Sequence, residues 1–267
     1  MGAVHLTVSE LARSVDFWRD AVGLEVLEQG AARASLGSAG HELLALVEEP
    51  DARPAHGFTG LFHVALLVPK RPALAAWLAH AGRDRIPLQG LSDHFVSEAI
   101  YLGDPDGHGI EIYADRPRAS WEEQVERLTT LPLDVDDLLG ELDDPETTTF
   151  EGLPGGTTVG HVHLRVADVP QSIAFYRDTL GFDLMATYSD QAAFLAAGGY
   201  HHHVGANTWQ SLGAPPAPEG TARLLHATVI LPEGARDELA GRLDADDTSD
   251  GPLVRDPSGN RLLLAAA

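Results

Sequence analysis

The chain has no cysteine and few basic residues, and each of these features excludes a class of function. Without cysteine, disulfides, thiolate zinc sites, iron–sulfur clusters and cysteine nucleophiles are all ruled out. Lys plus Arg number 18 against 40 Asp plus Glu, and the resulting net charge of −22 repels phosphate backbones and anionic lipids. We therefore expect neither a nucleic acid nor a membrane as partner.

Long apolar runs are also missing. No stretch approaches the roughly 18 apolar residues of a membrane span, and the N-terminus lacks the basic and apolar regions of a signal peptide. A cytoplasmic protein is expected. With 44% hydrophobic and 22% charged residues, the 267-residue chain has the composition of a globular protein and the length of two domains. Its 13 histidines point to metal chemistry with nitrogen and oxygen ligands.

The sequence repeats itself. Val-His-Leu at 4–6 recurs at 162–164 and Phe-Trp-Arg-Asp at 17–20 recurs as Phe-Tyr-Arg-Asp, both at an offset of 158. Leu-Phe-His before Val64 likewise resembles Leu-Leu-His before Ala227, and Asp-Pro-Asp-Gly resembles a later Asp-Pro-Ser-Gly. Such self-similarity predicts related structural units. There are four of them, at residues 1–50, 58–115, 158–212 and 221–267.

Each unit has the same rhythm of a short strand, a helix and three strands, separated by turns that contain glycine. One β-α-β-β-β unit has too little core to fold alone. We expect an α+β protein in which consecutive units pair, with their sheets curled around a cleft. The predicted domains are 1–115 and 158–267. Between them, 116–157 is expected to be a solvated acidic connector with one or two short helices, and a docking surface for the partner domain is the alternative.

Three side chains of the first half form a candidate metal site. His5 and His63 begin the first strands of units one and two, and Glu111 lies on the last strand of unit two. If related strands are adjacent, the three can converge in the cleft as a two-histidine, one-carboxylate triad, which suits Fe(II) and also Mn, Zn or Ni. Four other histidines are expected to be exposed or in loops: His56, His80, His108 and His161.

An Asp-Pro-Asp-Gly turn precedes Glu111, and Tyr101 lies on the other side of that turn. With this arrangement the sequence resembles the vicinal oxygen chelate superfamily, which contains glyoxalase I, bleomycin-resistance proteins and extradiol ring-cleaving dioxygenases. The stretch from His94 to Glu111 is similar to the extradiol signature. The likeness covers nearly the whole chain, including Ser-Asp-His-Phe-Val-Ser-Glu-Ala at 92–99 and Gly-Gly-Tyr-His-His-His at 198–203, and is strongest to catechol 2,3-dioxygenase-like bacterial proteins.

The resemblance implies two glyoxalase-like domains, metal ligands at His5, His63 and Glu111, and substrate-facing roles for His94 and Tyr101. By repeat alignment, His41 is a further acid–base candidate. The second half keeps His163 and His226, but Leu263 stands where Glu111 would recur, so the intact triad is expected in the N-terminal half. The sequence leaves open whether His163, His201, His203 and His226 form a second site.

The leading interpretation is an Fe(II)-dependent extradiol dioxygenase that cleaves a catechol-type aromatic diol with O₂. Two alternatives remain. The same ligands with Zn, Ni or Mn could polarise a carbonyl or epoxide in a glyoxalase-type isomerase, lyase or hydrolase, and a non-enzymatic protein could bind an aromatic drug in the cleft. The partners expected are a small aromatic substrate and O₂. The ring substrate, the native metal and the formation of a homodimer stay open.

Overall fold

The computed structural model describes residues 1–243 and 245–267 and confirms an α+β protein built mostly from strands. Unit one comprises β1 (Val4–Val8), α1 (Leu11–Phe17), β2 (Glu25–Gln29), β3 (Arg33–Ser38) and β4 (His41–Glu48). Unit two comprises β6 (Gly60–Leu67), α2 (Arg71–Asp84), β7 (Gly90–Asp93), β8 (Ser97–Gly103) and β9 (Gly109–Asp115). Unit three comprises β11 (Thr158–Arg165), α4 (Val169–Ile173), β12 (Asp183–Tyr188), β13 (Ala192–Ala196) and β14 (Val204–Asn207). Unit four comprises β16 (Leu224–Leu231), α5 (Glu233–Arg242), β17 (Asp246–Thr248), β18 (Gly251–Arg255) and β19 (Arg261–Ala266).

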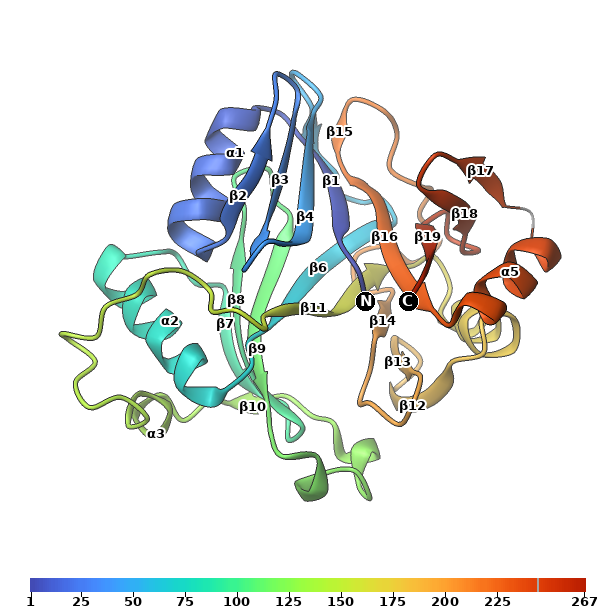
Figure 1. The fold of residues 1–267 in the computed structure, drawn as a ribbon. Coiled ribbons are helices and arrows are strands. Elements are labelled where there is room, and N and C mark those ends of the chain that lie inside the picture. The colour runs from blue at the N-terminus through green and yellow to red at the C-terminus, as the bar shows by residue number, and fades with distance from the viewer. Residues whose placement is uncertain (244) are drawn as a thin grey trace.

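The strands form two large sheets that do not follow the halves of the sequence. Sheet I has the order β17-β18-β19-β16-β1-β4-β3-β2. Sheet II has the order β10-β7-β8-β9-β6-β11-β14-β13-β12, in which β10 is the short strand Leu131–Pro132 between units two and three. Unit one therefore shares a sheet with unit four, and unit two with unit three. In Figure 1 the blue β1 lies beside the orange β16, and the two termini are close together.

This arrangement corrects the expectation that unit one pairs with unit two and unit three with unit four. The joining edges are β1 with β16 and β6 with β11, and both pairs are antiparallel. All four strands are apolar, so the sequence pattern alone does not say which two edges meet. The domain boundaries 1–115, 116–157 and 158–267 stay a prediction about folding units.

The apolar stripe of α2 shows why a helix forms beside sheet II. Leu74, Trp77, Leu78 and Ala81 are buried at the spacing of one helical face. The indole of Trp77 donates a hydrogen bond to the carbonyl of Val22, at 3.0 Å, which ties unit two to the end of the first helical segment. The first and second units thus share a core although they belong to different sheets.

The segment 116–157 is docked rather than simply solvated. Its β10 (Leu131–Pro132) pairs with β7, and its α3 (Val135–Leu139) packs near α2. Arg71 of α2 holds it by ion pairs to Asp137 (2.6 Å) and Glu141 (2.7 Å). The short strands β5 (Arg53–Pro54) and β15 (Thr221–Ala222) pair in parallel elsewhere. Among the described residues, none of the helices has the length and apolar character needed to cross a membrane.

Candidate metal centre

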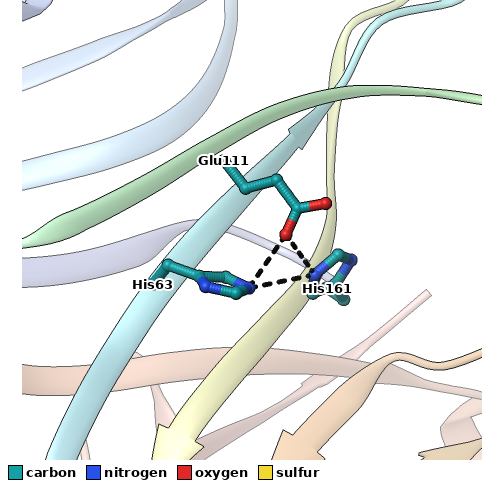
Figure 2. A group of neighbouring side chains, drawn as sticks. All are labelled: His63, Glu111 and His161. Carbon is teal, nitrogen blue, oxygen red and sulfur yellow. Dashed lines mark hydrogen bonds and ion pairs between the residues drawn. The ribbon is translucent and has the colours of Figure 1, made fainter. Parts of the chain in front are cut away.

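Three side chains of sheet II converge on one point. His63 comes from β6, Glu111 from β9 and His161 from β11, and Figure 2 shows them pointing toward one another. The Nε2 of His63 lies 2.9 Å from Oε2 of Glu111, and Nε2 of His161 lies 3.2 Å from the same oxygen. The two imidazole nitrogens are 3.3 Å apart. All three residues are buried, so these contacts form away from bulk water.

Strand order explains the convergence. Strand β6 lies between β9 and β11, and its Ala65 is in register with Glu111 on one side and His161 on the other. Neighbouring strands are about 4.8 Å apart, so the two outer backbones are separated by about 10 Å. The small methyl group of Ala65 leaves the space above β6 through which the longer side chains reach each other. His63, two residues earlier on β6, shares this face.

The donor set fits a divalent metal. Two ligand atoms about 2.1 Å from an ion are about 3.0 Å apart at an octahedral angle and about 3.4 Å apart at a tetrahedral one. The separations of 2.9, 3.2 and 3.3 Å lie within that range. Among the described residues, these alone bring three metal-ligating atoms within 4.8 Å of one another.

The protonation states also suit a metal, which requires neutral imidazole and ionised carboxylate. Burial lowers the pKa of His161 to about 4, although Glu111 opposes the shift. Burial by itself would raise the pKa of Glu111, but His161 and His63 hold that pKa well below its usual range. At neutral pH the cluster therefore offers one anionic oxygen and neutral imidazole nitrogen as donors.

Tyr101 and His94, the two residues that the resemblance implies face the substrate, lie beside the cluster. Tyr101 on β8 is directly opposite Glu111 on β9, and its ring centroid is 5.5 Å from that of His63. His94 Nδ1 lies 2.6 Å from the carbonyl of Thr129, which can only accept, so Nδ1 carries a proton. In the neutral ring Nε2 is then an acceptor, and the Tyr101 hydroxyl donates to it at 2.6 Å. Burial, followed by the charge of Glu111, raises the pKa of Tyr101, so the phenol stays protonated.

The cluster opens into a cavity of about 570 Å³, a volume typical of small-molecule sites. One wall is aromatic. Phe62 has its ring centroid 5.4 Å from that of Trp209 and 5.3 Å from that of His163, and Phe194 lies 5.8 Å from His163. His63, Glu111, His161, His94 and Tyr101 all line the same cavity. The chemistry-bearing groups and a flat apolar surface therefore face one shared space.

His5 and His41 lie elsewhere, which corrects two predicted site residues. His5 is on β1 in sheet I, where its ring centroid lies 4.0 Å from that of His226 with the two rings tilted by 31°, and its Nε2 lies 3.5 Å from Oε1 of Glu42. His41 begins β4 of the same sheet and is exposed. Because unit one pairs with unit four, neither residue faces the cavity between units two and three. His161 takes the position in the ligand set that the sequence suggests for His5.

Sequence reasoning missed His161, which is buried rather than exposed. Repeat alignment matches His5 with His163, and His161 corresponds to the unremarkable Ala3. The alternation of His161 and His163 was the available signal, since residues two apart on a strand share a face. The register of β11 against β6 shifts at Gly160, a β-bulge where a Cβ would collide with the Tyr113 hydroxyl. A bulge of this kind aims a side chain in a way that repeat spacing cannot predict.

The other histidines do not form a second metal cluster within the described chain. His163 lines the cavity, while His226 lies in sheet I. The Nδ1 atoms of His201 and His202 lie 2.7 Å apart. Nε2 of His201 donates a hydrogen bond to the carboxylate of Asp115 at 2.9 Å, because a carboxylate can only accept. The ring of His203 accepts a hydrogen bond from the amide of Ala197.

Comparison with known proteins agrees with this architecture. The family description "Glyoxalase/Bleomycin resistance protein/Dioxygenase superfamily" matches residues 1–112 and 158–264. The chain is 40% identical over 270 residues to a protein of Bacillus subtilis (strain 168) named catechol-2,3-dioxygenase, covering 96% of this chain and 93% of that protein. The protein therefore belongs to the glyoxalase/bleomycin resistance/dioxygenase superfamily.

Solved structures resemble the fold at low identity. Glyoxalase I from Zea mays superposes with a TM-score of 0.61 at 15% identity, covering all of this chain and 92% of that one. The cppA protein from Streptococcus pneumoniae TIGR4 gives a TM-score of 0.57 at 15% identity, covering 99% and 97%. At this level of identity, these similarities establish the fold, and the reaction has to be inferred from the residues of the site.

Proposed function

We propose that this protein is a metal-dependent extradiol dioxygenase that cleaves a catechol-type aromatic diol with O₂, with Fe(II) as the native metal. The observation that carries the proposal is the convergence of His63, Glu111 and His161 at the end of a cavity that also holds the His94–Tyr101 pair. The 40% identity to a protein named catechol-2,3-dioxygenase supports the same reaction.

His63, Glu111 and His161 would hold the metal on one face. Bound there, the metal supplies Lewis acidity, redox capacity and open positions for a diol and O₂. The aromatic wall of Phe62 and Trp209 orients the ring of the diol and excludes water from its face.

Tyr101 and His94 would take up the proton that the diol loses. The Tyr101 hydroxyl already donates to Nε2 of His94, so its lone pairs are available to accept a proton from a diol oxygen. Proton transfer from the diol to Tyr101, with the Tyr101 proton passing to His94, would leave a catecholate and a His94 imidazolium. The carbonyl of Thr129 holds that ring in place through Nδ1. General base catalysis of this kind contributes about 10²- to 10⁴-fold.

The alternatives are a glyoxalase-type enzyme with a redox-inert metal and a metal-free binding protein. The His94–Tyr101 pair beside the triad favours the dioxygenase over the first. The close approach of three buried ligand atoms favours a metal site over the second.

The deciding experiment is elemental analysis of anaerobically purified protein, followed by O₂ uptake and visible absorbance with catechol. We expect about one iron per chain and a yellow ring-opened product. Stoichiometric Zn, Ni or Mn without O₂ uptake would instead support the glyoxalase-type enzyme, and protein without any metal would support a binder.

A further inference from the structure

Arg165 occupies the same wall of the cavity as the metal ligand His161. Both are on β11, four residues apart, and His161, His163 and Arg165 all line the cavity. At about 3.3 Å per residue, the backbone of Arg165 is about 13 Å along the strand from that of His161. Its cross-strand neighbour on β6 is Gly60, which has no side chain to fill the space in front of it.

The guanidinium of Arg165 has no carboxylate partner among the described residues. Its Nε is buried without a hydrogen-bond partner, and burial lowers the pKa of the group, with no neighbouring acid to offset the shift. Among the described residues that line the cavity, Glu111 is the one carboxylate, and it already contacts His63 and His161. In a chain with 40 acidic and 18 basic residues, a partly buried arginine without an acidic partner is unusual, because burial of an uncompensated charge is unfavourable.

An aromatic slot lies between the two ends of the cavity. His163 separates His161 from Arg165 along the strand, and its ring contacts Phe62, Trp209 and Phe194. A flat ring placed there would have the metal cluster at one end and the guanidinium at the other. The planar fork of arginine matches a carboxylate through two parallel hydrogen bonds.

We infer that the substrate is an anionic catechol, in which a carboxylate-bearing substituent points away from the two hydroxyls and is held by Arg165. The inference rests on the proposed dioxygenase function and narrows its substrate class. Catechol itself would fill the ring slot but leave the Arg165 charge uncompensated. Arg165 is then the residue that determines specificity, while the metal ligands and Tyr101 act on the diol.

The test compares 3,4-dihydroxyphenylacetate with its methyl ester, which has the same diol ring without the charge. Binding of each is measured anaerobically by calorimetry on the full-length protein as purified, and O₂ uptake is measured separately. We expect the acid to bind about 10- to 100-fold more tightly than the ester, as a charged, bidentate contact provides. Arg165→Met should abolish that ratio, Arg165→Lys should keep part of it, and Arg83→Met on the outer face of α2 should leave it unchanged.

Equal binding of acid and ester by the wild-type protein would overturn the inference, even if Arg165→Met does not fold. A preference that persists in folded Arg165→Met would overturn the role of this residue. The two proposals fail differently. Without O₂ uptake on any diol, but with an acid preference lost in Arg165→Met, the dioxygenase proposal fails and the anion site stands. Turnover of both compounds with equal affinity leaves the dioxygenase and removes the anion site.

Discussion

His161 and His163 are two residues apart on one strand, yet their contacts differ. His161 has its Nε2 against both Glu111 and His63, whereas Nε2 of His163 has no partner within the described chain and its ring packs among aromatic side chains. His5, the repeat equivalent of His163, contacts His226 in the other sheet. Residue type and repeat position therefore do not decide which histidine can be a metal ligand. What decides it is whether an imidazole nitrogen points toward the other donor atoms.

Substituting these histidines separates the ligand set predicted by repeat spacing from the one seen in the structure. His161→Ala removes one of three donors, and we expect metal affinity to fall by roughly 100-fold or more. His5→Ala should bind metal as the wild type does, because its ring is in sheet I. Metal per chain after dialysis against a chelator measures both. Retained metal in His161→Ala with loss in His5→Ala would contradict the site.

At the scale of elements, the site depends on a small residue in β6 and a bulge in β11. Ala65 leaves the space over which Glu111 and His161 meet, and the bulge at Gly160 sets the direction of His161. The bulge residue cannot carry a Cβ without displacing Tyr113. Neither feature contributes a ligand atom, but both determine where ligand atoms lie.

Filling the space above β6 should weaken metal binding without removing a ligand. Ala65→Leu places a branched side chain between Glu111 and His161, and overpacking of this kind costs about 1–3 kcal/mol of stability. Ala45→Leu is the matched control, since Ala45 is equally buried but lies beside His5 in sheet I. Both variants should melt at lower temperature, and only Ala65→Leu should lose metal affinity. Equal affinities would show that the ligands do not meet over Ala65.

The contact between His5 on β1 and His226 on β16 predicts an effect of pH on the stability of the fold. Burial lowers the pKa of His5 and of His226 to about 4 each. Between pH 6.5 and about 4 the unfolded chain takes up protons at these positions and the folded protein does not, so stability falls as the pH falls through this window. Above pH 6.5 the contribution is fully present.

Melting temperatures at pH 7.5 and pH 5 test this expectation. Other buried histidines add to the loss at low pH, so the His5→Gln/His226→Gln double variant should show a smaller difference between the two pH values than the wild type, rather than none. The exposed His41→Gln variant should match the wild type. An unchanged pH difference in the double variant would mean that the pair titrates normally.

For the whole molecule, the central feature is that each sheet draws strands from both halves of the chain. Strands β6 and β11 pair along their length, and β1 pairs with β16. The candidate metal cluster takes His63 and Glu111 from the first half and His161 from the second. A half that folded alone would expose an apolar strand edge and would lack a ligand.

Cutting the connector tests this organisation. With a protease site inserted after the exposed Asp143, we expect the two fragments to stay together on gel filtration after cleavage and to keep their metal. Fragment 1–143 expressed alone should bind metal weakly, because it lacks His161. Fragments that separate without denaturant, with metal retained by 1–143, would instead support independent domains of 1–115 and 158–267.

The local pattern of the chain was sufficient for much of the fold and for part of the site. Alternating strands, a helix and three strands, repeated four times, predict the α+β units that the structure contains. His63, Glu111 and Tyr101 were also identifiable as candidates, because they lie on strands of one unit and their spacing is set locally. His94, in the turn after β7, was implied by the family resemblance. The third ligand comes from another unit, and local spacing carries no information about it.

The sequence by itself thus determined the repeated unit, the absence of thiol chemistry and the candidate ligands that unit two supplies. Tertiary structure decided which units share a sheet, and with it the replacement of His5 by His161 in the candidate cluster and the place of Arg165 in the cavity wall. The physical reason is that periodicity determines which side of a strand faces the core, whereas edge pairing depends on how complete faces fit together. The four edge-forming strands are similar enough in sequence that only their packing distinguishes them.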